Sequence, residues 1–594
     1  MKYIEGQGRR QLVLYTEMLD ELVGEDNPVR VIDEFVNMLD MRALGFTNTE
    51  TNAMKAGRPG YEPRSMLKLY IYGYFKKIRS SRKLMEACGC NTNVMWLMGR
   101  LEPDFRTISD FRKDNAEAIK KVFKAFVKMC IEMGLYSTEV GVQDGSKFSA
   151  NNSKDNNVTI PKLEKKMEIA EEKAEKYLDE LDKCDNEERE ESKYTKEEIE
   201  EKLGYLRENI GRYNECIQYM KEENISQMSF TDPESRLMNS ANGGFDVSYN
   251  VQIVVDPESH MVGYVEVTNE CNDKGQISPI MEEAKEAFGV EVIESVVDNG
   301  YEDRADMLEC LKKGTIPHVA SKETDEYELE IEYKDAEITE KELNSTKSED
   351  IEKCMSAGVV PNVYKDKGID ISIEESEEYG IEETDEESCF RLNEEGTAVI
   401  CPNGSVLPKV AELHGKGMTR YTSKSACSRC KEKCTKSAFK QVDLREGQKV
   451  VYAKKNRIVK KVKIKLRPDK EKIANRKCVV EHPFGTVKHW YDGSYTLLCG
   501  KRKVGADISL LFLAYNLRRA INMVGVQVLI ASMSLLFPFH FFIFFIFCFF
   551  CHSFANFSFF ATCFPSHFRT VCRQTSPPLR FWTNRQRHST LSSP

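Results

Sequence analysis

The spacing of apolar residues predicts a series of helices through the first 137 residues of the chain. Apolar positions recur about every 3.6 residues over 26–41, which begins with Asp-Asn-Pro, a common start of a helix. A largely apolar helix with a basic end is expected over 63–78, and Ser or Thr caps predict two more over 80–90 and 107–135. Arg and Lys fall on the exposed faces of these helices. Two interpretations fit that pattern equally: a DNA-binding domain, or a helical bundle whose charges are solvated.

Two long and very polar helices are predicted over 162–224. Their charges of opposite sign recur four residues apart, a spacing that stabilises isolated helices. We expect an antiparallel hairpin that is inserted into another domain and whose charges face solvent. A short strand predicted over 139–144 precedes the hairpin and ends in Asp144.

Strands and helices alternate over 245–321. The segments 246–256 and 261–270 alternate between polar and apolar residues and flank a Pro-Glu-Ser-His turn, so they predict a β-hairpin. A helix, a strand that ends in Asp298, a second helix and a second strand follow. This order predicts a mixed α/β core. The pattern becomes helical again over 470–524.

Two unlike segments separate these parts. Residues 323–390 are acid-rich with little apolar periodicity, and we expect a loosely ordered insertion there. A cysteine cluster follows within 391–453, and its candidate metal ligands are Cys401, Cys427, Cys430 and Cys434. One Cys-x-x-Cys pair with two further thiolates can hold a structural Zn²⁺. The alternative, which we weight equally, is a set of reduced thiols on a basic loop.

Composition and charge change this picture only in part. The length of 594 residues predicts several domains rather than one. The formal net charge of −10, taken alone, argues against binding to nucleic acid. The charge is segregated, however, into acidic runs over about 164–203 and 323–389 and a basic run over 454–477. Further basic residues gather in the N-terminal third: Lys76, Lys77, Arg79, Arg82 and Lys83. Because screening limits the reach of a charge to roughly 10 Å, the acidic total does not exclude DNA.

The two ends of the chain give further indications. The 19 cysteines and a polar start over 1–10, with no signal peptide, predict thiols or metal ligands in a reducing cytoplasm. Residues 526–551 carry no charge and are rich in Phe, so by length they could form a transmembrane helix. We prefer a frameshifted or read-through tail over 526–594. Phe runs followed by Ser-, Pro-, Arg- and Thr-rich sequence are typical of pyrimidine-rich DNA translated outside its frame.

Three carboxylates are the candidate catalytic residues. Asp144 and Asp298 each end a predicted strand, and Glu481 lies on a predicted helix. Converging carboxylates suit hard cations such as Mg²⁺ or Mn²⁺. A pair of such ions can stabilise both the attacking and the leaving oxygen at a phosphodiester. Any one acid at a strand end is by itself a weak indication.

The sequence around these carboxylates is more specific. The motifs GVQDGSKFSANNSK, TDPESRLM, VSYNVQIVVD, VVDNGYED and VVEHPFGTVKHW occur in this order. In these motifs the chain resembles the bacterial insertion-sequence DDE transposases. It is most similar to the IS-eleven-eighty-two group of the broader IS-four/IS-five-like superfamily. The resemblance covers about residues 5–525.

The resemblance implies an α/β, RNase H-like catalytic core with Asp144, Asp298 and Glu481 as the catalytic and metal-binding residues. It also implies that Lys488 and Arg476 bind phosphates of the transposon end, Lys as a point charge and Arg as a planar fork. Lys488 has the expected spacing, with six residues between it and Glu481. Arg476 is one residue off the spacing of the best-known branch of the superfamily.

The expected organisation has five parts. A helical DNA-binding domain over 1–137 precedes the first part of the core over 138–322, which carries the helical hairpin. An acidic and cysteine-containing insertion over 323–454 separates it from the last part of the core over 455–525, and the tail occupies 526–594.

Several other polar residues receive structural roles. Asp232 in TDPESRLM is expected to start a turn, with Arg236 paired to a nearby acid. Turn chemistry is preferred for Asp256 and Asp273. For His482 a DNA contact and a packing or hydrogen-bonding role are weighted equally.

Together these features predict a DNA transposase that binds terminal inverted repeats and catalyses metal-dependent cleavage and strand transfer of an insertion sequence. Its expected partners are double-stranded DNA, as inverted repeat and as target, and a second copy of the chain in a homodimer. Its expected location is the cytoplasm, at the nucleoid. One alternative is a catalytically inactive DNA-binding remnant of a decayed element. Another is a membrane protein anchored by 526–551.

Overall fold

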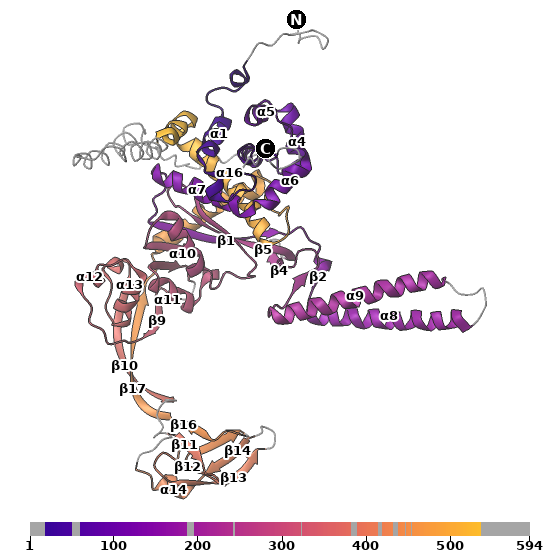
Figure 1. Ribbon diagram of the computed structural model, residues 1–594. Helices are drawn as coiled ribbons and strands as arrows, with labels where there is room; N and C mark the ends of the chain where they lie inside the picture. The colour runs from indigo at the N-terminus through magenta and orange to yellow at the C-terminus, as the bar shows by residue number, and fades with distance from the viewer. Residues whose placement is uncertain are drawn as a thin grey trace, which may run out of the picture. The chain divides into compact units, whose positions relative to one another are not determined.

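The computed structural model describes residues 18–49, 60–186, 195–240, 244–321, 324–381, 389–413, 418–431, 437–445, 447–452 and 454–535 (Figure 1). Contacts within the chain define two units, Met1–Met533 and Ser534–Pro594, and the elements that follow belong to the first. Cys434 and most of the predicted tail, 536–594, lie outside the described residues. Among the helices that are described, none is long and apolar enough to cross a membrane.

Helices make up the N-terminal part of the unit. They are α1 (Pro28–Met38), α2 (Met41–Leu44), α3 (Pro63–Phe75), α4 (Ser81–Cys90), α5 (Thr92–Met98), α6 (Phe105–Asp114) and α7 (Ala116–Glu132). The predicted start of α1 is confirmed: the Asn27 side chain accepts a hydrogen bond from the Val29 amide, and Pro28 fills the first helical position. Helix α3 is buried along nearly its whole length, as its apolar sequence predicts.

The prediction of one helix over 107–135 is wrong, because the helix is interrupted at Asn115, between α6 and α7. The Asn115 side chain donates to the Phe111 carbonyl at 2.8 Å and accepts from the Thr47 amide at 2.7 Å. Asn side chains compete in this way with the regular hydrogen bonds of a helix. The cap also differs from the expected Thr, since Asp104 accepts the amide hydrogen bond that starts α6.

A mixed sheet follows these helices in the chain and lies next to α7 (Figure 1). Its strands are β1 (Val140–Ser149), β4 (Arg236–Ser240), β5 (Gly244–Val255), β6 (Val262–Thr268), β7 (Ile293–Val297) and β8 (Thr315–Val319). The order across the sheet is β4-β5-β1-β7-β8, with β6 also paired to β5. Strand β5 is antiparallel to its partners, whereas β1, β7 and β8 run parallel. Every position of β7 and β8 is buried, as expected for parallel strands covered on both faces.

The strand predicted over 139–144 is longer in the structure. Strand β1 continues to Ser149 because its second half pairs with β5, whereas its pairing with β7 stops at Val142. The predicted β-hairpin is confirmed as β5 and β6, and the helix-strand alternation that follows is confirmed as well. Helices α10 (Ile277–Phe288) and α11 (Arg304–Lys312) connect β6 to β7 and β7 to β8.

Three helical elements follow the sheet in the sequence and pack against it. They are α15 (Lys470–Gly485), the π-helical turn η6 (Thr486–Trp490) and α16 (Lys501–Val524). Helix α15 contacts β1, β7 and β8, while α16 contacts β6 together with α3 and α7. Most of α16 is buried, so it joins the N-terminal helices to the sheet.

A buried ion cluster lies in this junction. The Asp507 carboxylate of α16 is 0% exposed and accepts from Arg79 at 2.8 Å. Arg112 of α6 stands 3.3 Å from the same carboxylate, which also accepts a hydrogen bond from the Tyr74 hydroxyl of α3. One carboxylate thus contacts three parts of the N-terminal region.

The predicted helical hairpin is confirmed as α8 (Ile160–Asn186) packed against α9 (Lys196–Glu222). Thr195 and Glu198 form a reciprocal capping box that starts α9. Short strands β2 (Asn157–Val158) and β3 (Met228–Ser229) pair at the base of the hairpin. A small apolar core joins them to the helices: Val158, Leu163, Ile217, Met220 and Met228.

The loosely ordered insertion predicted over 323–390 is wrong for the residues that are described there. They form β9 (Tyr327–Glu332), α12 (Glu340–Leu343), α13 (Ser348–Ser356) and β10 (Ile369–Ile381). Both strands pair with β17 (Lys454–Leu466), which carries the basic run. Ion pairs join the strands, as between Lys460 and Glu375 at 3.2 Å and between Lys463 and Glu374 at 2.7 Å. The acidic sequence is ordered because a basic strand, distant in sequence, lies against it.

The cysteine-containing segment also forms a sheet. Its elements are β11 (Cys389–Leu392), β12 (Ala398–Ile400), β13 (Val406–Leu413), β14 (Met418–Thr422), α14 (Lys424–Ser428), β15 (Gln441–Arg445) and β16 (Val450–Tyr452). The strand order is β15-β14-β13-β12-β11-β16. Cys401 and Cys427 pack against its apolar core.

Candidate active site

Asp144 and Asp298 lie at equivalent positions on two neighbouring parallel strands. Val142 of β1 is the register partner of Val296 of β7, and each aspartate follows two residues later. Because neighbouring strands are about 4.8 Å apart, the two carboxylates are neighbours at one end of the parallel part of the sheet. The Asp298 side chain also accepts from the Gly300 amide at 2.9 Å, which fixes the turn after β7.

Arg476 of α15 lies between these two aspartates. Its guanidinium is 3.5 Å from the Asp144 carboxylate and 3.9 Å from the Asp298 carboxylate, and its side chain is 15% exposed. The buried Nη1 atom makes no hydrogen bond within the described part of the chain. The contact of α15 with β1 and β7 brings this arginine to the end of the sheet.

The charge of the site is not balanced by this arginine. Burial raises the pKa of Asp144 to about 7, and the carboxylates of Asp298 and Asp273 add to the increase, while Arg476 opposes it. A carboxyl group with a raised pKa is one whose charged form lacks sufficient compensation. The site would therefore gain stability from a further cation.

Glu481 does not join the two aspartates in this structure. It lies on α15, five residues after Arg476, which places it about 140° further around the helix. Its side chain is 64% exposed and stands 3.5 Å from Lys477. Among the residues that are described, no three His, Cys, Asp or Glu side chains are grouped so that they could hold a metal ion. The fold brings together two of the three predicted carboxylates and places the third on the helix that packs against them.

Lys488 lies in η6, close to β1. Its ammonium group donates to the Ser146 hydroxyl at 2.6 Å and to the Lys147 carbonyl at 2.8 Å, and it lies 4.7 Å from the ring centre of Phe148. Burial lowers the pKa of Lys488 to about 8, and the Asp144 carboxylate opposes this decrease. The predicted phosphate ligand therefore lies beside the first catalytic candidate.

Asp273, for which a turn role was predicted, lies next to the site. Its backbone carbonyl does start the turn before α10, but its side chain accepts from Asn250 and Gln252 of β5, each at 2.7 Å. Lys147 stands 3.5 Å from the same carboxylate. The available signal was the pair Asn250 and Gln252, which are polar at alternate positions of a buried strand. Such a pair points to a polar network across one face of the sheet.

Gly145 explains how this network approaches Asp144. A Cβ atom at position 145 would lie 2.3 Å from the Gln252 amide nitrogen and 2.6 Å from the Asp273 carboxylate. No side chain fits there without displacing both groups. The Asp-Gly pair in the first motif is thus explained by packing at the site.

The remaining polar predictions have mixed outcomes. Asp256 has the predicted turn role, since its side chain accepts from the Ser259 amide at 2.8 Å. Asp232 starts a turn as predicted and is buried. Arg236 was predicted to pair with a nearby acid, but it donates to the Pro233 carbonyl at 2.6 Å. The His482 Nδ1 atom and the Tyr515 hydroxyl are hydrogen-bonded at 2.8 Å.

Three of the four predicted zinc ligands are described. Each of their sulfur atoms lies within hydrogen-bonding distance of a nitrogen: Cys401 of the Ser405 amide at 3.3 Å, Cys427 of the Lys440 amide at 3.5 Å and Cys430 of the Asn403 side chain at 3.2 Å. Cys401 and Cys427 are free cysteines. Their grouping as a zinc site, which also needs Cys434, stays a prediction.

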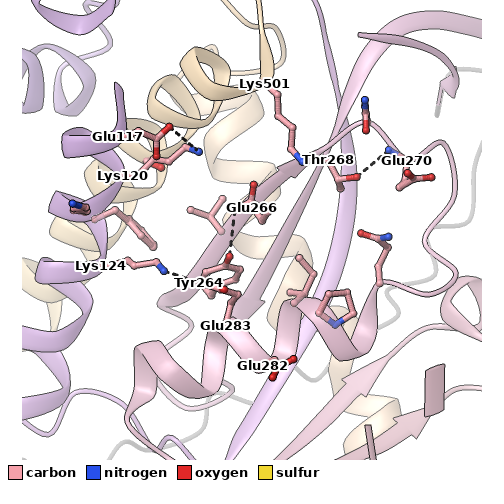
Figure 2. A pocket seen from close by; sticks show the side chains of 18 residues that line it. Glu117, Lys120, Lys124, Tyr264, Glu266, Thr268, Glu270, Glu282, Glu283 and Lys501 are labelled. Carbon is pink, nitrogen blue, oxygen red and sulfur yellow. Dashed lines mark hydrogen bonds and ion pairs between the residues drawn. The ribbon is translucent and has the colours of Figure 1, made fainter. Parts of the chain in front are cut away.

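A pocket lies elsewhere in the unit. It has a volume of 750 Å³ between α7, β6, α10 and α16, and none of the candidate residues lines it (Figure 2). Two of its lysines form ion pairs with glutamates of the same pocket, Lys120 with Glu117 at 3.7 Å and Lys124 with Glu283 at 3.2 Å.

Comparison with protein families finds two matches. Residues 17–114, which span α1 to α6, match a transposase domain (DUF772), and residues 400–521 match a transposase DDE domain. The second match includes Arg476, Glu481 and Lys488, while Asp144 and Asp298 lie outside it. Searches of curated proteins and of solved structures find no match. The two domains support a DNA transposase of the DDE type and, with it, roles in DNA transposition and recombination.

Proposed function

We propose that this chain is a metal-dependent DDE transposase of an insertion sequence in the IS-eleven-eighty-two group. The observation that carries the proposal is the pair Asp144 and Asp298 on adjacent parallel strands, with a charge that Arg476 does not balance. Such a pair suits a reaction at a phosphodiester, where cations must offset the negative charge of the transition state.

An RNase H-like core is part of the proposal. Its support is the strand order: the antiparallel strands β6, β5 and β1 lie side by side, and the parallel strands β7 and β8 follow on the other side of β1. The helical hairpin of α8 and α9 and the segment 324–452 then interrupt the chain between parts of this core.

The two aspartates fit Mg²⁺ or Mn²⁺, because both are hard oxygen ligands and Asp144 lacks compensation. When bound, such ions polarise the scissile phosphate and activate the attacking water or 3′-hydroxyl. Asp144 and Asp298 would hold the metal, and Glu481 would join them on leaving Lys477. Arg476 and Lys488 would hold phosphates of the DNA end.

The helices over 17–114 are proposed to recognise the terminal inverted repeats, and two copies of the chain to pair the two ends. We favour this active enzyme over an inactive remnant, because all three carboxylates are present on elements that pack against one another.

The test is strand cleavage of a labelled element end by the full chain, with Mg²⁺ or with a chelator. Asp144→Asn, Asp298→Asn and Glu481→Gln should each lower the cleavage rate on the order of 100-fold or more, since each removes a charge from the reacting centre. The control is Asp443→Asn, which alters a carboxylate paired with Arg420 outside the core sheet. Full cleavage by any of the three site variants would refute that residue's assignment.

A further inference from the structure

A second pocket lies beside the helix that carries Glu481. Its volume is 290 Å³, and it is lined by His482, the residue that follows Glu481 on α15. Trp490 of η6, Lys77 after α3, and Arg518, Arg519 and Asn522 of α16 also line it. No role assigned so far accounts for this set of cations and an aromatic ring.

The cations of this pocket have neutral partners. Arg518 donates to the Tyr491 hydroxyl at 2.8 Å and to the Phe75 carbonyl at 3.1 Å, and Arg519 donates to the Ser259 carbonyl. Within the described part of the chain, neither they nor Lys77 forms an ion pair with a carboxylate. The pocket between α7, β6, α10 and α16 differs, because glutamates among its lining residues pair with Lys120 and Lys124. Arg518 is exposed and Arg519 is half-buried, and cations that gather at one pocket without counter-ions attract an anion.

His482 lines the pocket with a ring whose orientation is fixed by hydrogen bonding. The ring is held in place by the Tyr515 hydroxyl, which itself donates to the His260 carbonyl at 2.7 Å.

Trp490 adds an exposed aromatic ring to the pocket. It is 67% exposed, so much of a large apolar ring faces solvent at the mouth of a positively charged pocket. The Lys77 ammonium lies 4.4 Å from the ring centre. Lys77 has a φ of 64°, a left-handed conformation that is uncommon for a residue other than glycine. Aromatic rings and cations in this combination bind nucleotides by stacking on the base and pairing with the phosphate.

We propose that this pocket binds one unpaired nucleotide of a DNA strand, with its base stacked on Trp490 and its phosphate held by Lys77, Arg518 and Arg519. The proposal rests on the proposed function, since it takes DNA as the substrate. A volume of 290 Å³ suits a single nucleotide and is too small for a duplex. A strand held there would lie against α15, the helix that carries Glu481.

The test measures binding without catalysis. A dye-labelled single-stranded oligonucleotide is titrated with the full chain in chelator, and its anisotropy gives the dissociation constant. Trp490→Ala should weaken binding by about 5- to 100-fold, whereas Trp490→Phe should keep most of the affinity, because stacking needs only a ring. Lys77→Ala should weaken binding and reduce the slope of log K against log salt by about 0.7.

The matched control is Tyr205→Ala, because Tyr205 on α9 is 67% exposed, as is Trp490, and lies outside the pocket. A duplex of the same sequence and free mononucleotide form the other arms. The proposal predicts that Trp490→Ala affects the single strand more than the duplex, and that mononucleotide competes weakly. It is overturned if Trp490→Ala binds the single strand as tightly as the Tyr205→Ala control does. It is also overturned if Trp490→Ala lowers the affinity for single strand and duplex equally.

The two proposals can fail separately. If the carboxylate variants lose cleavage while Trp490→Ala keeps full oligonucleotide binding, only the pocket proposal is refuted. If Trp490→Ala weakens binding while Asp144→Asn and Asp298→Asn still cleave, only the assignment of the catalytic residues is refuted.

Discussion

The Asp507 cluster and the candidate active site both combine aspartate with arginine, and only in the first do the arginines balance the negative charge. Asp507 is fully buried and contacts Arg79, Arg112 and the Tyr74 hydroxyl. Burial alone would raise the pKa of Asp507, but the two arginines and the tyrosine hold it below its usual value. At the candidate active site, burial prevails and the pKa of Asp144 rises to about 7.

The difference lies in how many donors each carboxylate has. Asp507 has two arginines and a hydroxyl for one negative charge, whereas Asp144 and Asp298 share Arg476 at 3.5 and 3.9 Å. The first arrangement fixes the N-terminal helices to α16. The second leaves a need for positive charge that the protein itself does not meet. Opposite signs of stability change should follow when each aspartate is replaced.

The largest effect is expected for Asp507→Ala. It leaves two buried arginines unpaired, and removing one partner of a buried ion pair costs about 3–5 kcal/mol. Denaturant unfolding at pH 5, 7 and 9 should show this loss at every pH, because arginine does not titrate there. The control Asp443→Ala breaks a partly exposed pair with Arg420 and should cost far less stability, because solvent screens such a pair. Similar losses for both variants would contradict the contrast.

Asp144→Asn should stabilise the folded chain. The folded-state pKa of Asp144 lies above its unfolded value of 3.8, so its contribution to stability is greatest below that value and is lost as the pH rises through about 7. Asparagine removes this loss, and the variant should gain roughly 2–4 kcal/mol at pH 8 in chelator. At pH 4 the gain should nearly vanish. A variant that is less stable than the parent at pH 8 would show that Asp144 is balanced after all.

Divalent cations should reduce the contrast between the two clusters. Mg²⁺ at about 100 times its dissociation constant should stabilise the parent chain by about 2.7 kcal/mol at pH 8, and chelator should reverse the effect. Calorimetry or thermal melting can follow it. Asp144→Asn and Asp298→Asn should lose most of this response, whereas Asp443→Ala should keep it. An equal response in all of these chains would place the ion elsewhere.

The smallest effect on stability is expected for Lys488→Met. Methionine keeps the contacts with Phe148 and Phe484, and the pKa of Lys488 is already lowered to about 8 by burial, so stability at pH 8 should change by less than about 1 kcal/mol. Binding of the DNA end should weaken, since a phosphate ligand is lost. A large loss of stability would instead assign Lys488 to the core of the fold.

Local patterns predicted much of the fold, because they depend on neighbours in sequence. The helical hairpin, the strands that carry Asp144 and Asp298, and the helix that carries Glu481 all follow from periodicity and capping. The break at Asn115 did not, since it requires the Thr47 amide from the turn after α2, which is distant in sequence.

The candidate site, too, could be predicted only as far as local sequence patterns reach. The register of β1 and β7 brings together two aspartates that were recognised separately in sequence. The contact of Asp273 with β5 depends on a pairing that no local pattern contains. The acidic β10 seemed unable to fold by itself, and it is ordered only because β17, far along the chain, supplies the opposite charge.

Because β10 and β17 pair with each other, the cysteine-containing sheet between them could be deleted as one segment. The last register pair, Ile381 opposite Lys454, brings together the two points where the chain leaves and re-enters the ladder. Antiparallel strands whose ends meet in this way can be closed by a two-residue turn. Replacing residues 382–453 with Asn-Gly would give an ordinary hairpin in unchanged register. An engineer could thus shorten this chain, or graft another domain at the same junction, while keeping the register of β10 with β17.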